Sequence, residues 1–257
     1  MTAASPKQRC FTDEEYLRLI EAWTAELFDI SAHHLDVTVP SCPGWRLRDL
    51  VHHVGNIAYF VNAVIDAAGP EPEFTDATPR PDPEITGWAA DQTRAMVKRL
   101  RTLDPATHVW NWSREPQRLD FWPRCIAHEA LVHAWDAHHA LGRERALPTR
   151  ACLDGIGEIL DVQLPLRTEE IADARWTAVV RATDEEARGA RWSVTIDHGA
   201  VDTVLTTGHQ AADDHPDVHP DVLLSGPADR LYLGLWRRVP LPLTHGAPDR
   251  VRVLCTD

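Results

Sequence analysis

The stretch RLRDLVHHVGNIAYFVNAVIDAAG (46–69) carries the clearest structural signal in this sequence. Apolar residues recur in it every three or four positions, at Leu47, Leu50, Val51, Val54, Ile57, Val61, Val64 and Ile65. This spacing places them on one face of an α-helix and predicts an amphipathic helix packed into a helical core. The preceding segment VPSCPGW (39–45) contains two prolines and a glycine, so a turn is expected before the helix begins.

Three more segments in the first half show helical spacing. The first begins after Thr12, and Glu15 three residues later completes the pattern of a capping box. A proline-rich acidic segment, 70–84, follows the second helix and predicts an exposed loop. Four helices with the longest connection after the second favour a four-helix bundle. The expected helices cover residues 13–30, 46–69, 86–103 and 124–141.

The second half of the chain changes character. A further helix is expected at 151–162, followed by short runs that are typical of β-strands. Another helix is expected at 227–237, before the last of these runs. Strands mixed with one or two helices predict a small α+β domain, so the fold class is α+β with two domains, 1–165 and 166–257. The expected strands cover residues 176–183, 191–196, 201–207, 222–226 and 250–255.

Composition excludes several classes of protein. The 257 residues carry a net charge of −13, which disfavours nucleic acid as a partner. No apolar run reaches the roughly 18 residues that span a bilayer, and the first residues lack the apolar core of a signal peptide, so we expect a cytoplasmic protein without membrane contact. Five scattered cysteines without a CxxC motif argue against a disulfide framework and a thiolate zinc site. Of the 26 basic residues, 24 are arginines, a bias typical of GC-rich genomes such as those of actinobacteria.

The segment RCIAHEALVHAWDAHH (124–139) offers metal ligands on one helix. Glu129 and His133 are four residues apart and share a face, and Asp136 lies on the same face. His128 is rotated by about 140° from His133, so this is not the HExxH motif of zinc proteases. Two ligands make half a site, and a solvent-exposed Glu–His pair is the alternative interpretation. Asp136 either orients an imidazole or anchors an arginine such as Arg124.

The helix at 46–69 can supply a third ligand. His53 lies on the flank of its apolar stripe, whereas His52 points away from the stripe and is expected at the surface. A lone histidine in that position can also be a hydrogen-bonded core residue. Together, His53, Glu129 and His133 match a catalytic site for a divalent metal, with two histidines, one carboxylate and an open position.

Three stretches resemble the maleylpyruvate isomerase family of mycothiol-dependent enzymes, within the DinB-like superfamily of metal-binding bundles. They are PSCPGWRLRDLVHHVG (40–55), RCIAHEALVHAWDAHHALG (124–142) and LSGPADRLYLGLWRRVP (224–240). The resemblance implies a DinB-like bundle over 1–165 and a small C-terminal domain over 166–257. It also implies that His53, Glu129 and His133 hold the metal, most simply Zn²⁺, and that an arginine of the C-terminal domain lies near the active site. Arg238 is the expected residue, with Arg237 as the alternative.

The resemblance further implies an enzyme with mycothiol as its thiol cosubstrate, either an isomerase or an S-transferase. A metal-bound thiolate would attack a small electrophilic substrate, while Arg238 would hold a substrate carboxylate. Two alternatives remain open at this point: a metal-dependent hydrolase or lyase that uses metal-bound water, and a non-catalytic protein that binds a small molecule. The expected partners are therefore small molecules, and the chain is expected to be a monomer or homodimer.

Overall fold

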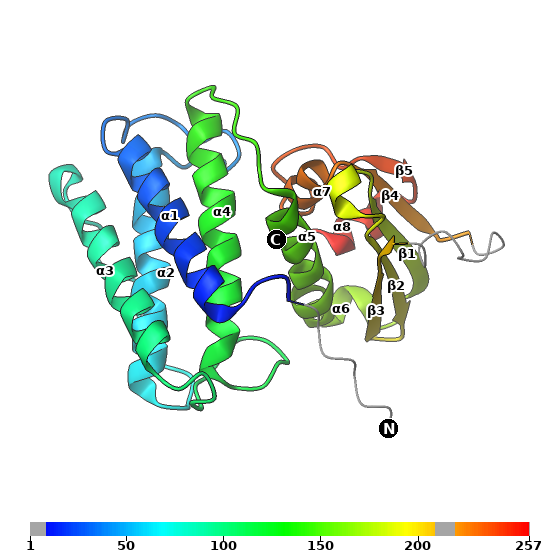
Figure 1. Cartoon of the computed structure of the whole chain (residues 1–257), viewed down its shortest axis with the longest axis horizontal. Coiled ribbons are helices and arrows are strands. Elements are labelled where there is room, and N and C mark those ends of the chain that lie inside the picture. The colour runs from blue at the N-terminus through cyan, green and yellow to red at the C-terminus, as the bar shows by residue number, and fades with distance from the viewer. Residues whose placement is uncertain (1–8, 209–218, 257) are drawn as a thin grey trace. The chain divides into compact units, whose positions relative to one another are not determined.

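The computed structural model describes residues 9–208 and 219–256 (Figure 1). Contacts divide the chain into two compact units, each with its own core. Phe11–Arg145 forms a helical unit. The described residues from Ala146 onward, together with Arg9 and Cys10, form a second unit that contains a sheet. This arrangement confirms the α+β class. Within the described ranges, no helix has the length and apolar character needed to cross a membrane.

The helical unit contains the four expected helices, with ends shifted by a few residues. Each helix packs against more than one of the others, as in a bundle. Thr12 caps the first helix through the expected box: its hydroxyl accepts from the Glu15 N–H at 3.3 Å, and the Glu15 carboxylate accepts from the Thr12 N–H at 2.8 Å. The helices are α1 (Asp13–Ser31), α2 (Leu47–Ala67), α3 (Asp82–Thr102) and α4 (Trp122–Ala140).

A glycine lets α2 and α3 approach closely. A Cβ atom at Gly55 would lie 2.6 Å from the Trp88 ring and 2.9 Å from the Ala89 Cα. These distances are shorter than van der Waals contact, so only glycine fits at this crossing without moving a helix. Gly55 lies two residues after His53, and the tight crossing therefore fixes the part of α2 that carries this histidine.

The second unit consists of one sheet and several short helices. Among the described residues, five strands form the sheet in the order β3-β2-β1-β4-β5, in which β1 and β4 are parallel and the other neighbours antiparallel. The strands are β1 (Arg175–Ala182), β2 (Arg191–Asp197), β3 (Ala200–Thr206), β4 (Val222–Gly226) and β5 (Leu243–His245). The helices are α5 (Thr149–Glu158), which continues as a π-helical turn (Ile159–Gln163), α6 (Thr168–Ile171), α7 (Ala228–Leu235) and α8 (Pro248–Leu254).

The strand expected at 250–255 is wrong, because this segment belongs to helix α8. Its alternating arginines and valines fit a strand, but Pro248 stands in the first helical turn, where its fixed φ favours a helix. The edge position in the sheet is taken instead by β5, which pairs with β4.

The boundary between the two units falls between Arg145 and Ala146, about twenty residues before the boundary expected from the sequence. Helix α5 packs against α7 and so joins the second unit rather than the bundle. A helical apolar pattern shows that a face is buried, but it does not show which neighbour buries it. The expected boundary at residue 165 followed the change from helix to strand pattern, which occurs after α5.

Candidate metal centre

Helices α2 and α4 bring the three expected ligands together. His53 projects from α2, and Glu129 and His133 project from α4 one turn apart. One ligand atom from each side chain lies within 4.8 Å of the other two. The two imidazole rings are 5.0 Å apart, centre to centre, and nearly perpendicular. A cluster of this size is compatible with one small cation between the three donors.

Two carboxylates hold the His133 ring from opposite sides. Its Nδ1 hydrogen-bonds Asp136 Oδ2 at 2.9 Å, and its Nε2 lies 3.3 Å from Glu129 Oε2. The Asp136 side chain is fully buried and the His133 side chain is 5% exposed, whereas Glu129 is 27% exposed. The Glu129–His133 pair is therefore not the solvent-exposed pair considered as an alternative. Of the two roles considered for Asp136, this contact supports the orientation of an imidazole.

The site favours positive charge. Burial lowers the pKa of His133, but the hydrogen bonds and charges of Asp136 and Glu129 outweigh burial and raise the pKa to about 9. At neutral pH the metal-free ring is therefore an imidazolium between two carboxylates. The residues present fit a divalent metal, because two imidazoles and a carboxylate are good zinc ligands and the surroundings stabilise a cation.

The turn before α2 packs against the two histidines. The Trp45 ring lies 4.9 Å from the His53 ring and 6.4 Å from the His133 ring, centre to centre, and is roughly stacked on the latter. Cys42 of the same turn places its Sγ 3.6 Å from Asp136 Oδ2. The sequence pattern predicts neither contact. Both residues lie in the turn next to the first ligand helix, which places them near the site. The sequence of a turn, however, does not show what its side chains contact.

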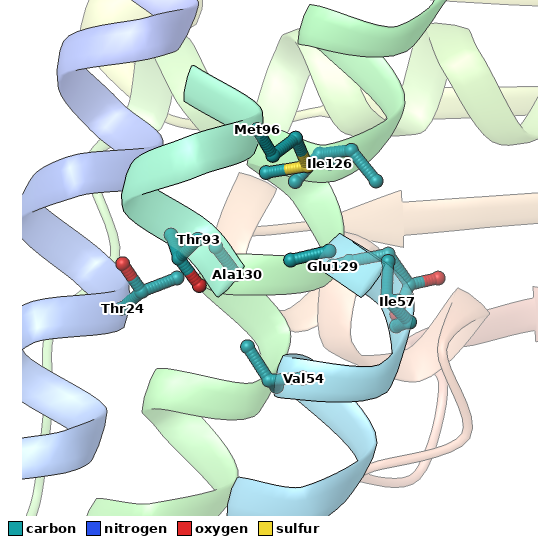
Figure 2. A pocket seen from close by; sticks show the side chains of 9 residues that line it. Thr24, Val54, Ile57, Thr93, Met96, Ile126, Glu129 and Ala130 are labelled. Atoms are coloured by element: carbon teal, nitrogen blue, oxygen red, sulfur yellow. The ribbon is translucent and has the colours of Figure 1, made fainter. Parts of the chain in front are cut away.

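The interior side of Glu129 is closely packed. Glu129 borders a cavity of about 10 Å³, which has room for at most one water molecule. Figure 2 shows that the surrounding side chains come from all four bundle helices. This cavity is too small to admit a substrate. The lining residues are Thr24, Val54, Ile57, Ala58, Thr93, Met96, Ile126, Glu129 and Ala130.

His52 is directed away from the cluster, as its position on the helix predicts, but it is half-buried rather than exposed. Its Nε2 lies 2.9 Å from the Ala77 carbonyl oxygen, and its ring stacks on Trp88 at 5.5 Å. The connection between α2 and α3 thus covers this side of the helix. His52 has a packing role in the structure, which makes it a useful control for its neighbour His53.

Arg238 lies just after α7, in the second unit. Its Nη1 donates to the Trp236 carbonyl at 2.9 Å, and the guanidinium carbon is 5.8 Å from the centre of the Trp236 ring. Arg237 between them has a positive φ of 58°, a left-handed conformation that bends the chain at the end of the helix. These contacts describe how the arginine is held, and its role towards a substrate stays a prediction.

Comparisons with known proteins bear on the family of the bundle and on the fold. Residues 16–138 match the family described as the mycothiol maleylpyruvate isomerase N-terminal domain. A crystal structure of the mycothiol-dependent maleylpyruvate isomerase is similar, with a TM-score of 0.63 and 15% identity over 93% of this chain and 97% of the other. A mutant of that enzyme matches over the same shares of both chains at 15% identity, with a TM-score of 0.56.

A search of curated protein sequences gives no significant match. The structural likeness extends over nearly the whole chain and supports the fold, while the family match covers α2, α3 and nearly all of α1 and α4, with all three candidate ligands. The resemblance seen in the sequence is thereby confirmed: the helical bundle of this chain belongs to the mycothiol maleylpyruvate isomerase N-terminal domain family, a family of enzymes.

Proposed function

We propose that this protein is a metal- and mycothiol-dependent enzyme that adds the thiol to a small electrophile, as an isomerase or an S-transferase. The observation that carries the proposal is the convergence of His53, Glu129 and His133 within 4.8 Å. The membership of the bundle in a family named for a mycothiol-dependent isomerase supports the choice of thiol.

His53, Glu129 and His133 would hold the metal, and Zn²⁺ suits this donor set best. A bound divalent metal would supply a thiolate at neutral pH, where a free thiol with a pKa near 8.5 is mostly protonated. Asp136 keeps the Nδ1 proton of His133 in place, so that Nε2 faces the other ligands. Trp45 packs against both imidazoles and helps to hold their rings in place.

Arg238 would bind a carboxylate of the electrophilic substrate. A guanidinium forms two parallel hydrogen bonds with a carboxylate, which orients the substrate as well as attracting it. In this proposal the enzyme works in the cytoplasm, where low-molecular-weight thiols are kept reduced. The reaction with maleylpyruvate is the first to assay, because the similar solved structure is named for it.

The test is metal analysis combined with calorimetric titration of mycothiol, on the wild type, His53→Ala and His52→Ala. His52 is the matched control, because it is an adjacent histidine on the same helix with its ring against Trp88. The proposal expects about one zinc per chain and mycothiol binding in the wild type and in His52→Ala. His53→Ala is expected to lose both.

The other outcomes separate the competing functions. Turnover of a substrate by the metal-loaded protein without any thiol would overturn the proposal in favour of a hydrolase or lyase. Small-molecule binding that persists unchanged in a metal-free His53→Ala protein would favour a non-catalytic binding protein. Arg238→Lys keeps the charge but loses the planar two-pronged donor, so KM for a carboxylate substrate is expected to rise about tenfold or more.

A further inference from the structure

We infer that Cys42 is a positioning residue of the metal centre, which acts by holding Asp136, the carboxylate that orients His133. The inference rests on the proposed function only in taking His133 as a metal ligand. The thiol lies 94 residues before Asp136 in the chain, and the fold brings the two together beside the bundle's ligand cluster.

Asp136 Oδ2 is shared by two donors. It accepts from His133 Nδ1 at 2.9 Å and from the Cys42 thiol at 3.6 Å. The Asp136 side chain has no solvent exposure, so its oxygens depend on donors from the protein to offset the loss of water. A thiol that donates to this oxygen restrains the rotation of the carboxylate, and the carboxylate in turn restrains the imidazole.

The backbone fixes where the thiol lies. Cys42–Trp45 is a β-turn in which the Trp45 N–H donates to the Cys42 carbonyl at 3.0 Å. Pro43 and Gly44, the latter with φ of +87°, occupy the two central positions as a type II turn requires. The turn is closed further by the Val39 N–H, which donates to the Trp45 carbonyl at 2.8 Å. Cys42 therefore sits on a rigid support.

The same turn packs directly on the ligands. Trp45 contacts the rings of both His53 and His133, so the turn cannot shift without disturbing the two imidazoles. The placement of Cys42 next to Asp136 is thus part of one packed arrangement of turn, ligand and carboxylate.

The thiol acts through Asp136 rather than as a ligand of its own. Donor atoms of Cys42, Asp136 and His133 also lie within 4.8 Å of one another. His133 Nδ1, however, is engaged by Asp136, while Nε2 faces Glu129 in the other cluster. A neutral thiol leaves the charge of Asp136 intact for His133, whereas a basic side chain in its place would compete with the imidazole for that charge.

The test measures the affinity of the full-length protein for zinc alone, by competition with a coloured chelator. The variants are Cys42→Ala, which removes the donor, and Cys42→Ser, which keeps a donor of shorter reach. Cys10→Ala serves as the matched control, because Cys10 is also a half-buried cysteine but belongs to the other unit. Circular dichroism checks that each variant is folded.

We expect Cys42→Ala to bind zinc about tenfold more weakly, which is the lower end of the effect of residues that support metal ligands. Cys42→Ser should recover most of that loss, and Cys10→Ala should match the wild type. Equal affinity of Cys42→Ala and the wild type would overturn the inference and leave the metal centre standing. Equal weakening by alanine and serine, or by Cys10→Ala, would overturn it as well, because packing rather than the donor would then explain the loss.

Stoichiometry supplies a separate check. Two zinc ions per chain in the wild type and one in Cys42→Ala would show that Cys42 is itself a ligand, contrary to the inference. A wild-type protein that binds no zinc at all would overturn the proposed function and this inference together. Zinc binding to the wild type therefore distinguishes a failure of this inference alone from a failure of the proposed function.

Discussion

The metal-free protein is expected to lose stability as the pH rises from 6.5 to 9. The pKa of His133 is raised from its ordinary value of 6.5 to about 9 in the folded protein, since Asp136 and Glu129 together outweigh the opposing effect of burial. A raised pKa means that the folded protein binds this proton more tightly than the unfolded chain. The resulting stability is fully present below pH 6.5 and is lost as the pH passes through 9.

The magnitude follows from the size of the shift. Each pKa unit corresponds to about 1.4 kcal/mol, so the shift of His133 contributes about 3 kcal/mol to the free energy of unfolding. Most of it should disappear between pH 6.5 and 9. With saturating zinc, the metal takes the place of the Nε2 proton, and the free energy of unfolding should no longer fall over this range.

The assay is urea denaturation followed by circular dichroism, at several pH values, with a chelator and with zinc. Asp136→Asn is the control, because it keeps the size of the buried side chain but removes the charge that holds the imidazolium. This variant should show a clearly smaller loss over the same pH range. A metal-free wild type whose stability is constant or increases between pH 6.5 and 9 would refute the reasoning, and so would an unchanged slope in Asp136→Asn.

Three further predictions concern the bundle. Gly55→Ala should lower the free energy of unfolding by about 1–3 kcal/mol, since its Cβ would meet α3 at under 3 Å. Gly87→Ala should raise the free energy of unfolding by about 0.5–1 kcal/mol, because the space around Gly87 is open. Thermal denaturation of both variants checks these two changes. Thr12→Ala should cost about 1 kcal/mol in urea denaturation, because it removes the cap of α1. Glu26→Gln should lower the free energy of unfolding near neutral pH, because it removes the ion pair with Arg145. Arg145 lowers the pKa of Glu26 more than burial raises it, so the ion pair is lost when this carboxylate is protonated. In urea denaturation, the difference in the free energy of unfolding between variant and wild type should therefore shrink as the pH falls below 4.5.

Helical periodicity accounts for the part of the site that could be predicted from the sequence. The direction of a side chain on a helix depends on its position relative to the apolar stripe, so His53 could be placed inward and His52 away from the core. The same rule put Glu129 and His133 on one face. The structure brings these three inward residues into one cluster.

Periodicity does not predict which element buries a face. The pattern at 151–162 indicates a helix, and the structure pairs α5 with α7 of the second unit. At 250–255 the alternation of arginine and valine is compatible with both a strand and a short helix, and Pro248 together with the edge strand β5 decides for the helix. The first difference depends on a packing partner that is distant in the sequence, whereas the second depends on Pro248 and β5, which lie close to the segment along the chain.

The turn at 40–45 shows a further limit that bears on function. Its two prolines and glycine predict a turn, but a turn has no period from which the direction of its side chains can be read. Cys42 could not be linked to Asp136 from the sequence, because their contact depends on how the turn packs against α4. Helices place ligands at fixed spacing, and the Asp136 carboxylate, which accepts from His133 on its own helix, also accepts from the Cys42 thiol of the turn. A rigid turn next to the first ligand helix is well suited to provide that donor, so we expect substitutions in it to change metal affinity while leaving the three ligands in place.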